Sequence, residues 1–161
     1  LLIQQTKTRI FEESVPRIKK CLAELTEDEI WQRPNENLSS IGNLVLHLCG
    51  NVTQWIGTGL GNRPDNRQRD NEFLPESRVS KQELINRLND LQTATVEVLD
   101  QLTEQDLTAT HRIQGFTETG VSVLVHVIEH FSYHTGQITW HTKLLRNKDM
   151  GYYSGKDLNE K

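Results

Sequence analysis

Apolar residues recur every three, four or seven positions in four long segments of the chain. This spacing gathers them on one face of an α-helix, and such a face must be buried against another element. The sequence shows no regular strand pattern of comparable length. We therefore predict an all-α protein built as a four-helix bundle. The predicted helices cover residues 3–25, 39–56, 80–102 and 121–145.

Capping residues and one proline mark the ends of these helices. Pro16 interrupts the first segment, where we expect a kink. The segment Thr26–Glu29 has the form of a capping box and predicts a separate short helix. Ser39 or Ser40 is the expected N-cap of the second long helix. A further capping box, Ser80–Glu83, is predicted to open the third.

The connections between the helices differ in character. Residues 62–77 contain prolines, asparagines and a cluster of Arg and Asp, which indicates a surface loop that could fold over a site. Residues 103–120 form a second connection, in which residues 108–116 are predicted to pair as a short strand or hairpin. The polar segment after the last helix is expected to drape over the bundle or over a partner subunit.

The length and charge of the chain limit its organisation and its partners. A chain of 161 residues is most simply one domain, so we expect residues 1–161 to form a single domain, with the helical bundle in 1–147 and a tail in 148–161. The 18 basic and 22 acidic residues are interspersed and give a formal net charge of -4. This balance argues against a nucleic-acid or membrane partner.

The two cysteines bear on the compartment. Cys21 and Cys49 form no CxxC motif, which favours a reducing, intracellular environment, although a single bridge between them stays open. Neither a leader-like start nor an apolar run of roughly 20 residues is present in the sequence given. We therefore expect a cytoplasmic protein.

Histidines provide the main indication of chemistry. His130 and His134 stand four residues apart in the last predicted helix, so their rings share one face and can reach one metal ion. His126 extends the same stripe by one turn. His47, between apolar neighbours on the second helix, is a natural third ligand, because facing helices of a bundle commonly supply side chains to one core metal.

The same residues allow other interpretations. Each histidine could instead be a core residue satisfied by a hydrogen bond. His126 could replace His134 beside His130, and Glu129 could enter as a carboxylate ligand. We leave two histidines out of the site: His141, expected near the surface at the helix end, and His111, in the connection.

Several residues other than the histidines also bear on function. Cys49 is expected to be a small buried apolar residue rather than a ligand or nucleophile. Trp55 and Trp140 are predicted to anchor the core. The arginine cluster in residues 62–77 is expected to be solvated, with carboxylate binding as the alternative. The sequence has no GxSxG motif and therefore does not indicate a Ser-His-Asp hydrolase. The arginines of the cluster are Arg63, Arg67 and Arg69.

Two segments, residues 46–56 and 126–138, resemble the DinB/YfiT-like superfamily. The specific element is the block His-x3-His-x-Gly-Gln-Ile that begins at His130, and the order of elements is also similar, with long connections after the second and third helices. The resemblance implies a four-helix bundle of the DinB/YfiT-like type. It also implies a divalent metal ion, zinc, nickel or iron, held by three histidines. Carried onto this chain, the ligands would be His47, His130 and His134, with His126 outside the ligand set.

The resemblance also implies a range of functions. Characterised relatives include thiol-dependent S-transferases and isomerases, in which the metal binds a low molecular weight thiol and lowers its pKa. We therefore expect a small-molecule substrate and a metal-dependent transferase or hydrolase, with a non-catalytic, metal-stabilised binding module as the alternative. Gln137 and Tyr133 are expected to support a ligand or contact the substrate. The broad apolar faces of the second and fourth long helices predict self-association, and we expect a homodimer.

Overall fold

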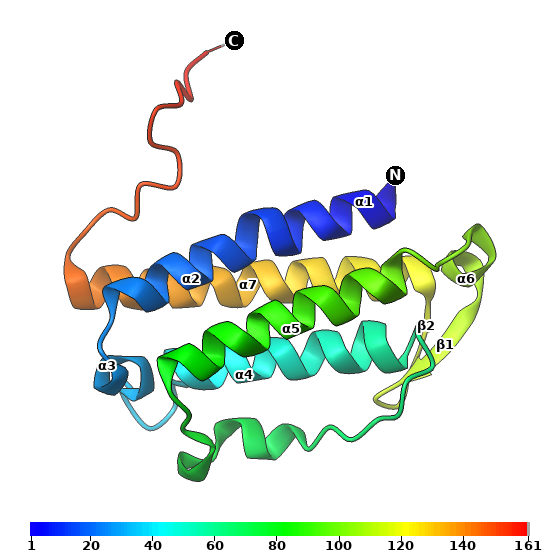
Figure 1. Cartoon of the computed structure of the whole chain (residues 1–161), viewed down its shortest axis with the longest axis horizontal. Coiled ribbons are helices and arrows are strands. Elements are labelled where there is room, and N and C mark those ends of the chain that lie inside the picture. The colour runs from blue at the N-terminus through cyan, green and yellow to red at the C-terminus, as the bar shows by residue number, and fades with distance from the viewer. Residues whose placement is uncertain (161) are drawn as a thin grey trace.

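A computed structural model describes residues 1–160. Four long helical rods run side by side in this part of the chain (Figure 1). The first rod comprises α1, η1 and α2, the second α4 and η2, the third α5 and the fourth α7. The elements in chain order are α1 (Leu2–Lys7), the π-helical η1 (Thr8–Ser14), α2 (Val15–Glu24), α3 (Glu27–Trp31), α4 (Ile41–Val52), the π-helical η2 (Thr53–Thr58), the 3-10 turns η3 (Arg69–Phe73) and η4 (Pro75–Ser77), α5 (Lys81–Leu99), α6 (Glu104–Thr108), β1 (Thr110–Ile113), β2 (Phe116–Thr119) and α7 (Gly120–Arg146).

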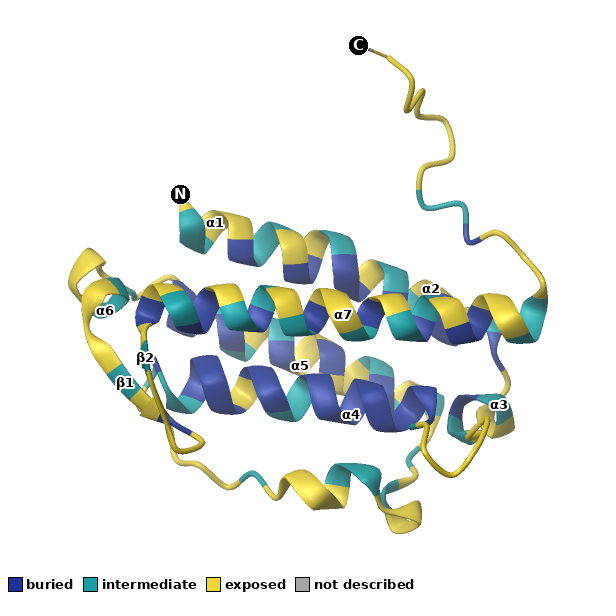
Figure 2. Ribbon diagram, turned by 180° about the vertical axis from the view of Figure 1, so that it is seen from behind, coloured by how far each residue is buried: buried dark blue, intermediate teal, exposed yellow. Residues whose placement is uncertain are grey.

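The predicted all-α fold is confirmed, and the core lies where the periodicity predicts it. The buried faces of all four rods turn toward one another (Figure 2), with α7 packed against α2 and α4, and α5 packed against α4 and α2. Burial of these apolar side chains is the main source of stability in such a bundle. Fully buried members of the core include Ile10, Ile18, Leu48, Leu88, Leu124 and Phe131.

Local signals explain the helix boundaries. Thr26 and Ser40 form capping boxes with Glu29 and Asn43, which satisfies free N–H groups at the starts of α3 and α4. Ser80 accepts a hydrogen bond from the backbone N–H of Glu83, but the predicted reciprocal bond is not formed, because the Glu83 carboxylate pairs with Arg87. The region of the expected kink is a π-helical segment, η1, and Pro16 follows it in the first turn of α2, where a missing N–H is tolerated.

The connection between α4 and α5 covers the outer face of α4. Its 3-10 turn η3 packs directly on that helix, so α4 is buried on nearly every side (Figure 2). The indole N–H of Trp31 donates to the carbonyl of Val79 and ties the end of the loop to α3. The loop therefore forms part of the structure around α4.

The connection between α5 and α7 contains the predicted hairpin and a short helix that we did not predict. Strands β1 and β2 pair antiparallel through a two-residue turn at Gln114 and Gly115, both with positive φ, as a tight hairpin turn requires. Helix α6 precedes them and starts at a capping box formed by Thr103 and Asp106. Ile113 is buried and anchors the hairpin on the bundle.

The segment after α7 begins by packing against the bundle. Met150 is buried, and the hydroxyl of Tyr152 lies 2.9 Å from Thr139 Oγ1 and 3.2 Å from Cys21 Sγ. Cys21 and Cys49 are both free thiols, so the bridge left open by the sequence is not formed. Within residues 1–160, every helix is too short or too polar to cross a lipid bilayer.

Candidate metal centre

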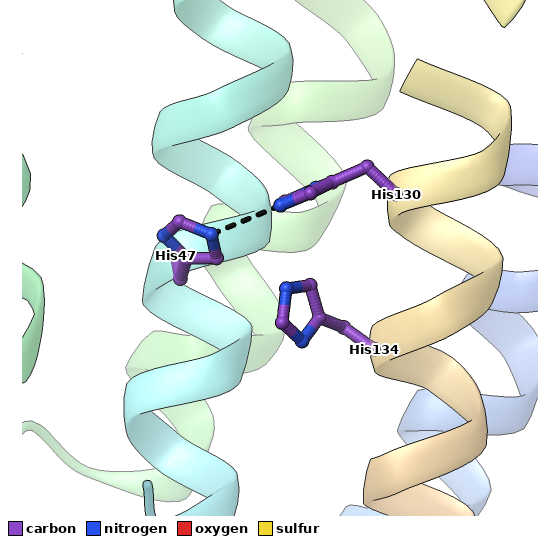
Figure 3. A group of neighbouring side chains, drawn as sticks. All are labelled: His47, His130 and His134. Carbon is purple, nitrogen blue, oxygen red and sulfur yellow. Dashed lines mark hydrogen bonds between the residues drawn. The ribbon is translucent and has the colours of Figure 1, made fainter. Parts of the chain in front are cut away.

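Three histidines from two helices meet in the interior of the bundle (Figure 3). His47 comes from α4, and His130 and His134 come from consecutive turns of α7. One ring nitrogen of each lies within 4.8 Å of the others, and the Nε2 atoms of His47 and His130 are 3.0 Å apart. The structure therefore brings together the three residues predicted as ligands.

Glu72 fixes the proton of His47. Its Oε2 atom lies 2.8 Å from Nδ1 of His47. Burial alone would raise the pKa of Glu72, but hydrogen bonds from His47 and Arg67 outweigh burial and lower it. The resulting carboxylate can only accept, so Nδ1 must donate and Nε2 is left with a free lone pair. Arg67 Nη2 also lies 3.2 Å from Nδ1, but the closer, charged acceptor decides where the proton resides.

Arg67 holds Glu72 in this position. Its Nε and Nη2 atoms donate to the two carboxylate oxygens over 2.7 and 3.0 Å, and Nη1 donates to Gln54 on η2. The side chains of Arg67 and Glu72 are only 6% and 11% exposed, so solvent screens this two-point pair little. The loop after α4 thus contributes a carboxylate that orients a histidine on the helix beneath it.

Gly50 makes this approach of the loop to α4 sterically feasible. A Cβ atom at Gly50 would lie 2.0 Å from Oε1 of Glu72 and 2.9 Å from Nε of Arg67. Real Cβ contacts are never that short, so any side chain here would displace the pair. The absence of a side chain at Gly50, one turn beyond His47, therefore leaves room for the carboxylate.

Gln137 performs the equivalent role for His134. Its Oε1 atom lies 2.7 Å from Nδ1 of His134, one turn away on α7. An amide oxygen accepts, so Nδ1 donates and Nε2 again carries a free lone pair. The support expected from Gln137 is therefore seen as a hydrogen bond. Tyr133 meets the His134 ring edge-on at 4.9 Å between centroids.

The rings of His130 and His134 suit a divalent cation better than a proton. Burial, followed by the nearby His134 and His47, lowers the pKa of His130 to about 3. Burial also lowers the pKa of His134. Neutral imidazoles that aim lone pairs at a common space are the donor set used by zinc, nickel and iron. The residues present therefore fit a metal ion, with His47, His130 and His134 as the group that could hold it.

The remaining histidines lie outside this group. His126 stacks on Trp55, with 3.8 Å between ring centroids, and Glu129 is exposed and turned away. His111 contacts the backbone carbonyl of Asp106 at 2.9 Å. The expectation of a surface position for His141 is wrong, because His141 is 5% exposed and burial lowers its pKa.

Two cavities flank the histidines. The larger, of about 570 Å³, is here called the aromatic cavity, and its lining includes Leu44, Phe73, Tyr133, His134 and Trp140. The smaller, of about 270 Å³, is called the polar cavity, and its lining includes Asn51, Trp55, Gln114, Glu118 and His126. Both cavities are also lined by His47, His130 and Arg69. The cluster is therefore accessible from two sides.

A third, larger cavity, of about 690 Å³ beneath the loop after α4, includes none of the three histidines, so its size does not make it the reactive site.

A family model described as "Protein of unknown function (DUF1572)" matches residues 3–154, nearly the whole chain. The chain belongs to the DUF1572 family. A search of curated proteins found no match.

Several solved structures have the same fold as this DUF1572 member. A DinB-like protein from Bacillus cereus matches with a TM-score of 0.67 and 21% identity, over 84% of this chain and 88% of that one. A DinB-like protein from Bacillus subtilis matches with a TM-score of 0.69 and 18% identity, over 90% of this chain and 94% of that one. A conserved protein from Enterococcus faecalis matches with a TM-score of 0.71 and 20% identity, over 90% of this chain and 97% of that one. At these identities the likenesses show the fold, and two of the three neighbours are DinB-like proteins, as the resemblance implied.

Sequence reasoning misjudged some residues around the site of this DUF1572 protein. Arg67 was expected to be solvated with its neighbours, yet it is buried against Glu72. Trp140 was expected in the core but is 61% exposed at the aromatic cavity, whereas Trp55 is buried as predicted. No motif or spacing pointed to Glu72. The one available signal was the mixed Arg and acidic content of the loop, because buried charges occur in pairs.

Proposed function

We propose that this protein is a metal-dependent enzyme in which His47, His130 and His134 hold a zinc, nickel or iron ion. One observation carries the proposal: three imidazoles converge, and two of them, His47 and His134, have one ring nitrogen hydrogen-bonded to Glu72 and Gln137, which leaves the other nitrogen to bind an ion. A histidine whose second nitrogen donates to a carboxylate or amide is typical of a ligand.

The class of reaction follows from the donor set and the cavities. When bound, an ion with three neutral ligands would supply a Lewis acid that lowers the pKa of a thiol or of water. We propose a thiol-dependent S-transferase-like reaction, with a low molecular weight thiol as cosubstrate, or a hydrolysis. The aromatic cavity would bind the apolar part of a small-molecule substrate, and Tyr133 and Trp140 would contact it there.

The cavities favour this proposal over a non-catalytic, metal-stabilised module. A structural metal site is usually closed by protein side chains, whereas a catalytic one keeps a position accessible. Here His47 and His130 each line two cavities, one on either side of the cluster. A small molecule in either cavity would lie beside the histidines.

We also propose that the protein is a cytoplasmic homodimer built from single-domain chains. The expected contribution of the second long helix to self-association is wrong, because α4 is covered by the loop after it. The last helix keeps an exposed apolar stripe, and two free cysteines suit a reducing compartment. Outside the aromatic cavity, the stripe comprises Val121, Val125 and Leu144, each at least 40% exposed.

Metal analysis tests whether the three histidines hold an ion. Protein purified without a histidine tag should carry about one divalent ion per chain, since a three-histidine site holds a single ion. His130→Ala should lose that ion, and His111→Ala, which changes a histidine outside the cluster, should keep it. Equal, negligible metal in all three proteins would refute the proposal. Thiol-dependent turnover of an electrophile, measured on the loaded protein, then separates an enzyme from a metal-stabilised module.

A further inference from the structure

Three buried polar atoms beside the polar cavity have no hydrogen-bond partner within residues 1–160. They are Asn51 Oδ1, His126 Nε2 and His130 Nδ1. All three residues line the same cavity beside the histidine cluster. Asn51 itself is only 4% exposed. Because a buried polar atom without a partner is costly, their clustering around one cavity indicates that a polar molecule completes them.

The size of the cavity is that of a small ligand. Its volume of about 270 Å³ exceeds that of a single water molecule, whose share of the liquid is about 30 Å³. One wall is the ring of His126, stacked on Trp55, and the Trp55 indole N–H is itself satisfied by Gln114 Oε1 at 3.1 Å. The Trp55 indole therefore needs no hydrogen bond from a ligand in the cavity.

The charges at the cavity have opposite signs. Arg67 is neutralised by Glu72. The other cation of the lining is Arg69, whose side chain is 54% exposed and whose ionic contact, to the solvent-exposed Asp70, is long at 3.8 Å. The anion is Glu118 on β2, a half-buried carboxylate that accepts a hydrogen bond of 2.6 Å from Ser122. A ligand that matches both must carry a cationic donor and an anionic acceptor.

The unpartnered atoms divide in the same way. Asn51 Oδ1 accepts only, and so requires a donor from the ligand. The imidazoles of His126 and His130 can each offer an N–H, and the Nδ1 atom of His130 is the one turned away from His47. Asn51 Oδ1 and Glu118 therefore suit an ammonium, whereas the two imidazoles and Arg69 suit a carboxylate.

We propose that the polar cavity binds an α-amino carboxylate head group, the zwitterion shared by free amino acids and their derivatives. The ammonium would bind Asn51 Oδ1 and Glu118, and the carboxylate would bind Arg69 and the imidazole N–H groups. Since His130 lines both this cavity and the aromatic cavity, the remainder of the molecule extends past the cluster. The inference rests on the proposed function only in treating this molecule as a substrate.

Nuclear magnetic resonance of the ¹⁵N-labelled protein tests the binding with glycine as the probe. The indole N–H of Trp55 is the reporter, because it lies beside His126 and Gln114 in the cavity wall. Glycine should shift this signal in a saturable way. Acetate and ethylamine, which carry only one charge each, should bind at least about tenfold more weakly, because each leaves part of the polar lining unpaired. No saturable shift with glycine, or equal binding of the three probes, would overturn the proposal.

Two substitutions locate the site. Asn51→Ala and Glu118→Gln should each weaken glycine binding by about tenfold, as expected for the loss of one charge-assisted hydrogen bond. Glu118 lies on the hairpin outside the bundle core, so its variant remains informative if the change at buried Asn51 impairs folding. Asn86→Ala, at an exposed position on α5, is the matched control and should bind glycine as the wild type does. Unchanged binding in the Glu118 variant would overturn the proposal.

Metal content, measured on the same samples, separates this inference from the proposed function. Glycine binding in a protein that takes up no metal would support the polar cavity and refute the metal-dependent enzyme. Metal uptake without glycine binding would leave the enzyme proposal intact and overturn the assignment of the cavity.

Discussion

The carboxylate of Glu72 lies 2.8 Å from Nδ1 of His47, although 25 residues of sequence separate them. Arg67 holds the same carboxylate through two hydrogen bonds. The orientation of a histidine on α4 is therefore decided by the loop that follows the helix. This relationship can be tested without knowing the reaction.

Glu72→Gln should weaken metal binding by about 10–100-fold, the usual cost of removing a partner that orients a ligand. The neutral amide keeps the shape of the side chain but loses the charge that fixes the His47 proton. Competition with a chromophoric chelator measures the affinity. Glu76→Gln, an exposed change in the same loop, is the control. Equal affinities in the two variants would contradict a positioning role for Glu72.

Gly50→Ala should reduce metal affinity to a similar extent, by about tenfold or more. The added methyl would overlap the Glu72 carboxylate and force it away from His47. Gly57→Ala is the matched control, because a Cβ there meets its nearest neighbours at an ordinary 3.9 Å. The same chelator competition measures both. Wild-type affinity in the Gly50 variant would show that the loop can shift without loss of the site.

Cys49 should be unreactive in the folded protein. Burial raises the pKa of its thiol to about 12, so its thiolate population near neutral pH is about a thousandfold below that of an ordinary cysteine. A disulfide reagent should therefore modify Cys49 only after denaturant is added, and mass spectrometry identifies the modified position. Cys49→Ala should keep any thiol-dependent turnover. Cys49 is half-buried, so rapid labelling in native buffer would contradict the raised pKa of its thiol.

The ion pair between Glu29 and Arg146 should make stability sensitive to acid. Hydrogen bonds from Arg146 and then from Thr26 lower the pKa of Glu29 from 4.5 to about 2. A carboxyl whose pKa falls on folding favours the native state above its unfolded pKa, and this contribution is lost as the pH drops from about 4.5 to about 2. Glu29→Gln should therefore be less stable than the wild type near neutral pH, with the difference vanishing near pH 2.

Urea unfolding across this pH range measures the effect. Glu36→Gln, at an exposed position, should follow the wild type throughout. A constant stability difference between Glu29→Gln and the wild type at every pH would show that the loss comes from packing or from the α3 cap and not from ionisation.

The exposed apolar stripe on α7 should mediate the proposed homodimer. Leu144→Glu places a charge within the stripe and should shift the protein to monomers, because burying an unpaired charge opposes association. Leu74→Glu, at an exposed apolar residue in the loop, should leave the dimer intact. Light scattering coupled to size-exclusion chromatography gives the mass. A monomeric wild type would refute the dimer itself.

The sequence predicted the helices well because long apolar periodicity leaves little choice. The last predicted helix, 121–145, differs by one residue at each end from α7. The short helix α6 was missed because five residues are too few for periodicity to show, although Thr103 and Asp106 have the spacing of a capping box. Local signals at short elements therefore deserve the same weight as periodicity at long ones.

The site was predicted in part. Spacing drew attention to His130 and His134, and the apolar surroundings of His47 on the second helix made it the natural third ligand. The resemblance then favoured these three and set His126 aside, in agreement with the cluster that the structure forms. Metal ligation by the three remains a prediction. Glu72 could not be foreseen, since its role depends on how an aperiodic loop folds back on α4. Trp140 and His141 were exchanged between surface and core because neighbours on a helix differ by about 100°, which composition alone does not resolve.

The separation of 83 residues between His47 and His130 has a consequence for biosynthesis. A nascent chain cannot assemble the cluster until α7 has left the ribosome and docked against α4, so the site forms late and through contacts of long range. Metal insertion would then follow completion of the bundle and would act on a nearly finished protein. An ion bound at that stage would tie α7 to α4 across these 83 residues.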